Sequence, residues 1–300
     1  MSGLDIIDLS LLPAPAVIET LDYEAILTAL KADLSARDPT LEAVLELESE
    51  PLTKLLEVCA YRETLLRQRV NDAAHAVMVA YATGTDLDQI GANYGVLRLV
   101  IIPADPLANP PVVEVLESDT AYRARIVLSL EGYTNAGSVG AYQFHGLSAS
   151  GQVKGIGVYS TVSGQVDIAV LSHTGTGAAA QTLRDTVAAA LNAEEVRPLC
   201  DTVVVRSATI VEYTIIAALT IYPGAASDPI LSAAQSATAA YVAAQHALGR
   251  DITRSGLFAC LHQPGVQNVT LTAPAADLVI AWDAAGWCTA TTITLAGIGE

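Results

Sequence analysis

Apolar and polar residues alternate with a helical period through the first hundred residues. The pattern predicts a helix over 23–36 with Asp22 as its N-cap, shorter helices over 40–48 and 85–95, and one uninterrupted helix over 51–83. The last of these would span roughly 50 Å at about 1.5 Å per residue, well beyond the roughly three to four turns usual in globular proteins. Either this helix breaks, or part of it projects and is covered by something else.

One face of the 51–83 helix is apolar along its whole length. Its positions recur at steps of three, four or seven and are Leu52, Leu55, Cys59, Leu66, Val70, Ala73 and Val77. We call these residues the seam. A seam of this kind needs a partner helix along its length, and the short helices before it can cover only part of it.

The helical pattern stops at a proline-rich, apolar stretch, IIPADPLANPPVVEVL. We interpret 103–111 as an extended linker or a domain border, with either a hinge or a static spacer as its role. Two helices are predicted after it, over 117–131 with Ser118 or Asp119 as the cap, and over 139–149.

From residue 151 the pattern becomes that of strands alternating with helices. Strands are predicted over 153–160, 164–172, 201–208, 211–223, 266–274 and 288–297, and helices over 175–195, 228–249 and 252–263. The order of strand, helix and strand occurs twice, which predicts two small α+β sandwich domains with mixed sheets, and a diverged duplication is one interpretation of it.

The predicted fold is therefore α+β, with an N-terminal helical bundle segment that contains a long helix, followed by the two sandwich domains. The predicted divisions are a helical region over 1–100, a proline-rich linker with a helical pair over 101–150, and α+β domains over 151–209 and 210–300.

Composition indicates a chain with much apolar surface to bury. Hydrophobic residues make up 52% of the 300 residues and charged residues only 16%, which favours burial between subunits. The net charge of −17 argues against nucleic-acid binding, because that requires clustered Lys and Arg. The uncharged stretch 229–249 contains Gln235, Gln245 and His246, so a packed Ala-rich helix is favoured over a membrane span.

The candidate chemical groups do not form a catalytic or metal-binding motif. Cys59, Cys200, Cys260 and Cys288 lack metal or disulfide spacing and are expected to be reduced and mostly buried. Gly175 and Gly177 sit between a strand and a helix without the rest of a phosphate-binding fingerprint.

Two further combinations resemble enzyme or metal sites only in their residue types. Ser255, His262 and Asp277 have the types of a hydrolase triad without a nucleophile elbow. Cys260, His262 and His246 supply fewer than the roughly four ligands of a closed zinc site. We predict no enzyme activity, no metal and no cofactor.

Two pairs of side chains are candidates for contacts with other subunits. Arg123 and Arg125 are close together in a chain with few charges, and they point in different directions. Pairing with local acids is the alternative. Tyr142 and His145 share a face of the next predicted helix, where ordinary packing is the alternative.

Long stretches of this sequence resemble the baseplate J protein family, the wedge component of contractile phage tails and R-type bacteriocins. The most specific are the block at 49–95, which includes PLTKLLEVCAYRETLLRQRV, and the block at 117–149, which includes ESDTAYRARIVLSLEGYTNAGS. Further similarity lies in LNAEEVRPLCDTVVV, in HALGRDITRSGLFACLHQPGVQNVTL and in the opening IIDLSLLPAPAVIETLDYEAIL.

The resemblance implies a structural role in a baseplate. Members pack into wedges with copies of themselves and a second wedge protein, around a central hub and spike and next to sheath-proximal baseplate proteins. They join the wedges into a ring and relay the contraction trigger. The location implied is the baseplate of a virion or tail-like particle, assembled in the bacterial host cytoplasm without membrane insertion. Transferred to this chain, Leu55, Leu66, Val70 and Val77 would form the bundle surface. A baseplate-associated cell-wall hydrolase is the alternative function, and a host-receptor binding protein fits the helical first third less well.

Overall fold

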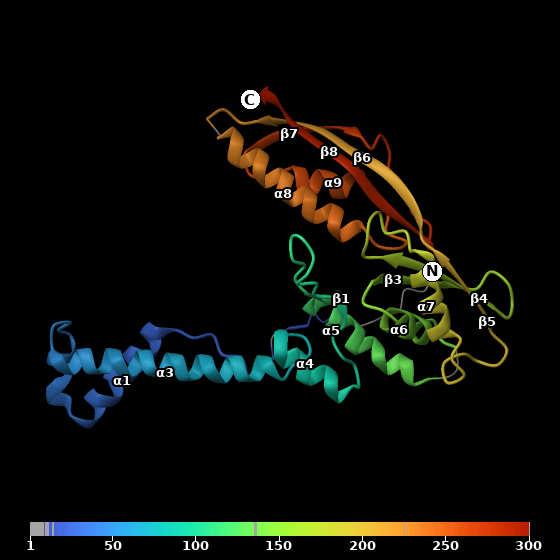
Figure 1. Ribbon diagram of the computed structural model, residues 1–300. Coiled ribbons are helices and arrows are strands. Elements are labelled where there is room, and N and C mark those ends of the chain that lie inside the picture. Colours follow the sequence, from blue (N-terminus) through green and yellow to red (C-terminus); the bar gives the residue numbers. More distant parts are fainter. Residues whose placement is uncertain (1–8, 10–11, 14, 135–136, 225, 300) are drawn as a thin grey trace. The chain divides into compact units, whose positions relative to one another are not determined.

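The computed structural model describes residues 9, 12–13, 15–134, 137–224 and 226–299. The described chain divides into two compact units that meet in sequence at Leu97 and Arg98. We call them the helical unit and the α+β unit, and each is described by itself (Figure 1).

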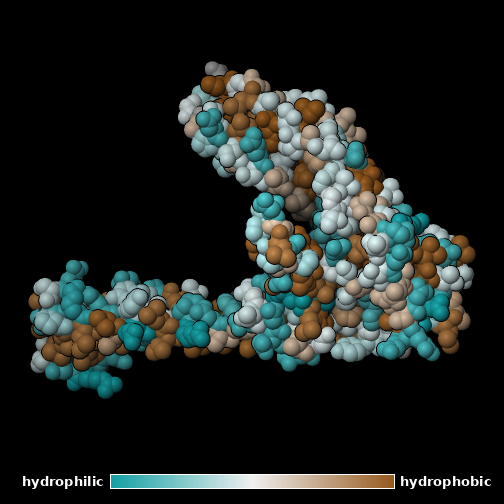
Figure 2. Space-filling view, in the orientation of Figure 1, coloured by the Kyte–Doolittle hydropathy of each residue, from teal (hydrophilic) through white to brown (hydrophobic). Residues whose placement is uncertain are grey.

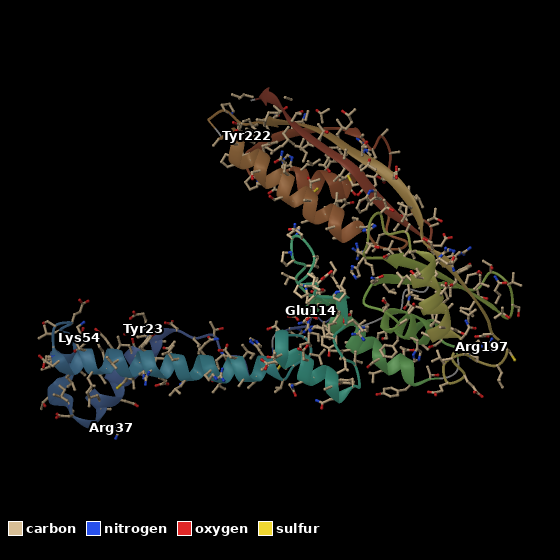
Figure 3. The ribbon with its side chains drawn as sticks, viewed as in Figure 1. Tyr23, Arg37, Lys54, Glu114, Arg197 and Tyr222 are labelled. Carbon is tan, nitrogen blue, oxygen red and sulfur yellow. The ribbon has the colours of Figure 1, made fainter. Side chains whose placement is uncertain are left out.

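The helical unit is built around one long helix. Its elements are α1 (Tyr23–Arg37), a 3-10 turn (Pro39–Leu41), α2 (Glu42–Leu45), α3 (Pro51–Ala76) and α4 (Gly84–Asn93). The Asp22 side chain caps α1 by accepting hydrogen bonds from the backbone N–H groups of Glu24 and Ala25, as predicted. Helix α1 packs against α3, and the Tyr23 hydroxyl donates to the Glu57 carbonyl at 3.5 Å. Figure 3 labels Tyr23 and Lys54 on this helix pair.

The long helix is shorter than predicted, because it ends at Ala76 rather than continuing to residue 83. Its 26 residues span about 39 Å. At Val77 the backbone leaves helical dihedrals, and the next residues turn. Beyond this turn, Ala82 and Leu87 of α4 are almost fully buried. No proline or glycine lies between Pro51 and Gly84, so the sequence does not mark this break.

The proline-rich segment forms the loop of a hairpin rather than an extended linker. Strand β1 (Val100–Ile102) pairs antiparallel with β2 (Val115–Leu116), and Asp105 and Val112 form a further bridge. The Asp105 carboxylate accepts hydrogen bonds from the backbone N–H groups of Leu107 and Ala108, which fixes the turn. Because the two ends of 103–111 meet in one hairpin, the segment does not connect two domains, and the hinge interpretation loses its basis.

Two helices follow the hairpin, and the first has Ser118, one of its two predicted caps, as its N-cap. They are α5 (Asp119–Leu128), which continues as a 3-10 turn (Ser129–Tyr133), and α6 (Val139–Ser148). The Ser118 hydroxyl accepts a hydrogen bond from the backbone N–H of Ala121, and Ser138 does the same for Ala141.

The first sandwich domain is a three-stranded mixed sheet covered by helices. Its strands are β3 (Val153–Tyr159), β4 (Gln165–Ser172) and β5 (Thr202–Ser207), and α7 (Gln181–Leu191) lies between β4 and β5 in sequence. Strand β4 is central, antiparallel to β3 and parallel to β5. Its buried side chains pack with Val187 and Leu191 of α7 and with Tyr142 of α6.

The second sandwich domain also has a three-stranded mixed sheet. Its elements are β6 (Thr209–Ile221), α8 (Ser227–Gln245), α9 (Arg254–Leu261), β7 (Val266–Ala273) and β8 (Ala284–Ile298). Strand β6 is central, antiparallel to β7 and parallel to β8, and both helices share its core. The α+β prediction with mixed sheets is confirmed. The strand parallel to β4 is β5, the next strand along the chain, whereas the strand parallel to β6 is β8, the last strand of its domain. The two domains therefore differ in topology.

None of the helices in the described part of the chain is both long and apolar enough to cross a membrane. Helix α8, which covers most of the stretch weighed as a span, instead packs in the core of the second sandwich domain through Ile230 and Ala234.

Candidate assembly interface

Most of the seam is exposed in the isolated chain, although Leu52 is half-buried and Val77 lies at the C-cap, just beyond the end of α3. The exposed fractions of Leu55, Leu66, Val70 and Val77 are 58%, 68%, 59% and 74%. The residues of α3 that are buried are Thr53, Ala60 and Asn71. At about 100° per residue, these three lie on the side of α3 opposite to Leu55 and Leu66. Figure 2 shows hydrophobic residues, in brown, on the surface of the helical unit.

Helix α3 uses small and polar side chains for its contacts within the chain. The Asn71 amide donates to the Glu19 carbonyl at 2.9 Å and accepts from the Glu19 N–H at 3.1 Å. The Thr53 hydroxyl donates to the Leu45 carbonyl at 3.4 Å. Helix α3 therefore buries only small or polar side chains, and it leaves a row of large apolar side chains exposed among exposed charged residues such as Arg62 and Arg69.

A second exposed apolar row lies beside the seam, and the sequence reasoning missed it. Val58, Tyr61 and Leu65 are all more than two-fifths exposed. Their spacing of three and four residues is the signal that would have revealed them. Between α1 and α3 there is also an open groove of about 440 Å³ whose lining includes Ile26 and Leu30. Helix α3 thus offers apolar surface in more than one direction.

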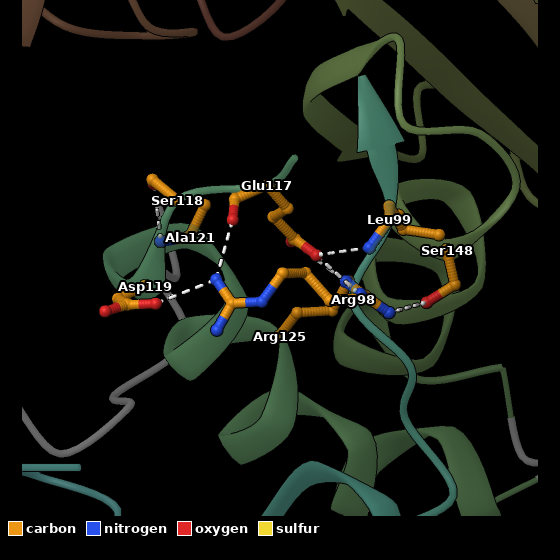
Figure 4. A network of polar contacts seen from close by, with 8 residues as sticks. All are labelled: Arg98, Leu99, Glu117, Ser118, Asp119, Ala121, Arg125 and Ser148. Atoms are coloured by element: carbon orange, nitrogen blue, oxygen red, sulfur yellow. Dashed lines mark hydrogen bonds and ion pairs between the residues drawn. The ribbon is translucent and has the colours of Figure 1, made fainter. Parts of the chain in front are cut away.

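Arg125 lies inside the α+β unit and is not available to a partner. Only 4% of its surface is exposed. Its guanidinium forms a bidentate pair with Glu117, with Nη2 to Oε2 at 2.6 Å and Nε to Oε1 at 3.0 Å (Figure 4). The Glu117 carboxylate also accepts from the Leu99 N–H, and Nη1 of Arg125 reaches the Ser148 hydroxyl. The interface prediction for Arg125 is therefore wrong, and its acidic partner precedes the helix.

A second arginine extends this polar cluster. Arg98 forms an ion pair with Asp119 at 2.8 Å and donates to the Glu117 carbonyl. Its guanidinium lies 4.6 Å from the ring centroid of Tyr122, which is a favourable cation–π distance. The cluster connects the start of α5 to Arg98 and Leu99, which precede β1, and to Ser148 at the end of α6.

Tyr142 is also internal, with 2% of its surface exposed. Its hydroxyl donates to the Asp201 carboxylate at 2.9 Å, and burial, reinforced by this carboxylate, raises the pKa of the phenol. A partner contact through Tyr142 is thus ruled out by its burial. Arg123 and His145 are half-buried, and the His145 Nε2 lies 3.2 Å from the Gly132 carbonyl. Their role at an interface stays a prediction.

Two of the eleven tyrosines are expected to resist ionisation at alkaline pH. Burial raises the pKa of Tyr142 and of Tyr213 above the ordinary value of about 10. The folded chain therefore keeps these protons when the unfolded chain has lost them, so stability is unaffected below about pH 10 and falls as the pH rises further. Absorbance titration at alkaline pH should show that both phenols ionise only when the chain unfolds. In Tyr142→Phe, one fewer tyrosine should ionise in this way. Early ionisation of all phenols would contradict the assignment.

The residues considered for chemistry do not assemble into a site. Asp277 accepts a hydrogen bond from the Arg254 N–H, and no hydrogen bond joins it to Ser255 or His262 within the described chain. No group of three or more metal-ligating side chains gathers among the described residues. The burial predicted for the cysteines is wrong, because Cys59 and Cys200 are exposed and the other two are half-buried.

Comparisons with known proteins identify the class of this chain. Three family models match, those of the Baseplate J-like N-terminal domain over residues 48–105, the Baseplate J-like central domain over 134–207 and the Baseplate J-like protein C-terminal domain over 213–296. The chain is 53% identical to baseplate protein J of Escherichia phage P2, over 99% of this chain and all of that protein. It therefore belongs to the Baseplate J-like family, which confirms the resemblance.

A solved structure also matches part of the chain. It is a chain of the cryo-EM structure of the anti-feeding prophage baseplate, symmetrised six-fold, at 11% identity and a TM-score of 0.40. The match covers 64% of this chain and 48% of that one.

Proposed function

We propose that this chain is a structural subunit of the baseplate of a contractile tail or tail-like particle, and that it enters the wedges of that baseplate through the seam on α3. The identity to a baseplate protein along the whole chain supports the general role. The observation that carries the specific role is the exposure of large apolar side chains on α3, namely Leu55, Leu66 and Val70, in a helix whose buried residues are all small or polar.

The energetics of the seam favour a permanent contact. Complete burial of one aliphatic side chain is worth about 1.5–3 kcal/mol. Leu55, Leu66, Val70 and Val77 together would contribute several times that amount to an association, and obligate interfaces are apolar in this way. Left uncovered, the same surface favours aggregation.

The partners that this role requires are other copies of the chain and a second wedge protein. Contacts with the central hub or spike and with sheath-proximal proteins would then join the wedges into a ring that relays the contraction trigger. Assembly would take place in the bacterial host cytoplasm, and the chain would act without catalysis.

Co-expression tests this proposal. We expect the chain expressed alone to self-associate or precipitate, because the seam is uncovered, and to become soluble as a defined complex when a second wedge protein is produced with it. Solubility and mass in solution are the measurements. A stable monomer that does not bind the second wedge protein would contradict the proposal.

A further inference from the structure

A groove lies between α8 and the outer edge of β8 in the second sandwich domain. Its volume is about 560 Å³. One wall is formed by Ala239, Val242 and Ala243 of α8, and the other by 287–291 of β8. Its lining also includes Lys154, His173 and His246, which lie close to one another. The groove therefore has an apolar α8 wall, a mixed β8 wall and a polar end, formed by these three residues, that carries positive charge.

The β8 wall of this groove is the open edge of a sheet. Strand β8 is the outermost strand, and among the strands of the described chain it pairs with β6 alone. Outside that pairing, the described chain gives it backbone contacts only at its start, where Gly249 donates to the Ala284 carbonyl and Leu248 bridges to Ala285. From Trp287 to Ile298 the strand contains no charged residue and no proline. Natural proteins commonly use such residues to protect an edge from pairing with another chain.

The polar end of the groove contains a cation, and no carboxylate is among the described residues that line the groove. The Nζ of Lys154 lies 2.7 Å from Nδ1 of His246, and Nε2 of His246 lies 3.1 Å from the Thr176 carbonyl. Because a carbonyl only accepts, Nε2 carries the proton and Nδ1 accepts from the lysine. This neutral imidazole is the one polar partner of Lys154 within the described residues.

The charges around the pair leave the lysine uncompensated. Burial lowers the pKa of His173, and the charge of the nearby Lys154 lowers it further. Glu117 acts on His173 in the opposite direction, but its carboxylate is already held by Arg125. Burial lowers the pKa of Lys154 itself. In a chain of net charge −17, a half-buried cation at the end of a groove is complementary to an incoming carboxylate.

We propose that this groove binds an extended segment of another protein, which adds a strand to the outer edge of β8 and places a carboxylate against Lys154. Backbone hydrogen bonds to an open edge tolerate many sequences, so the strand supplies affinity, and the carboxylate fixes the register. The segment expected is short, uncharged and β-forming, with Asp, Glu or a free C-terminus at one end. This contact is separate from the seam and goes beyond the proposed function.

The test measures binding of a defined peptide to the full chain by fluorescence polarisation, with the wedge complex used where the chain alone is insoluble. The probe is a fluorescein-labelled peptide of alternating Thr and Val that ends in Glu with a free terminus. Its control ends in an amidated Gln. We expect the control to bind about tenfold more weakly, because a hydrogen bond to a charged group is lost.

Variants of the chain separate the two parts of the proposal. Lys154→Met should weaken binding of the acidic peptide by the same factor and leave binding of the control peptide unchanged. Ala243→Phe should abolish binding of both peptides by filling the groove. Ala240 is an exposed residue of α8 outside the groove lining, so Ala240→Phe should leave the binding of both peptides unchanged.

Equal binding of the acidic and control peptides, or an unchanged affinity in a folded Lys154→Met variant, would overturn the carboxylate site. No binding of either peptide at millimolar concentration would overturn the strand addition. Neither outcome bears on the proposal for the seam, because the seam variants are tested by a different measurement, the assembly of the particle.

Discussion

Replacing Leu66 and Val70 together by glutamate is expected to abolish incorporation of the chain into baseplates while leaving the chain folded. Both side chains are mostly exposed in the isolated chain, at 68% and 59%, so the change removes little from its own fold. In an assembled bundle the same change removes about 1.5–3 kcal/mol for each aliphatic side chain and buries two carboxylates without partners. Particle yield and electron microscopy measure assembly, and circular dichroism measures the fold.

The control keeps the charge and the helix but leaves the seam intact. Gln68→Glu adds a carboxylate at an exposed position of α3 that is not part of the seam, and it should assemble normally. Normal particles from the Leu66→Glu and Val70→Glu double variant would show that the seam is not an interface.

Arg125→Met is expected to lower the free energy of unfolding of the α+β unit by about 3–5 kcal/mol, because it leaves the buried Glu117 carboxylate without its partner. The pair is bidentate and lies in the interior, so solvent cannot replace the guanidinium. Calorimetry of the variant and the parent chain gives the difference.

Two further variants make this result specific to the buried pair. Adding Glu117→Gln to Arg125→Met should recover part of the loss, since the unpaired charge is then removed. Lys54→Met breaks an exposed pair with Glu57 in the helical unit and should have little effect on the free energy of unfolding of that unit. If Arg125→Met lowered the free energy of unfolding as little as Lys54→Met, the pair of Arg125 and Glu117 would not be important for the stability of the α+β unit.

The sequence was sufficient to predict the features that depend on local pattern. Asp22 and Ser118 cap the helices that their side chains predict, because capping involves groups only two or three residues apart. The exposure of Leu55 and Leu66 also followed from the pattern, since the apolar period continued beyond what the preceding short helices could cover.

Features that depend on distant residues were not predictable. The end of α3 at Ala76 has no proline or glycine to mark it, and the nearly buried Ala82 and Leu87 follow it in the chain. The hairpin around 103–111 requires pairing of Val100 with Leu116, which a proline-rich composition hides.

Two of the candidate interface residues, Arg125 and Tyr142, could not be assigned from the sequence for the same reason. Arg125 is paired with Glu117, which lies before its helix rather than on it. Tyr142 is held by Asp201, 59 residues away. A pair of polar side chains on a helix does not show whether its partner is another chain or a distant part of its own.

The most direct test is an electron-microscopy map of the assembled particle in which this chain is traced. The expected result is that Leu55, Leu66 and Val70 of α3 are covered by helices of neighbouring chains. A map in which α3 is folded back and covered by its own chain, or in which these side chains face solvent, would contradict the proposed role.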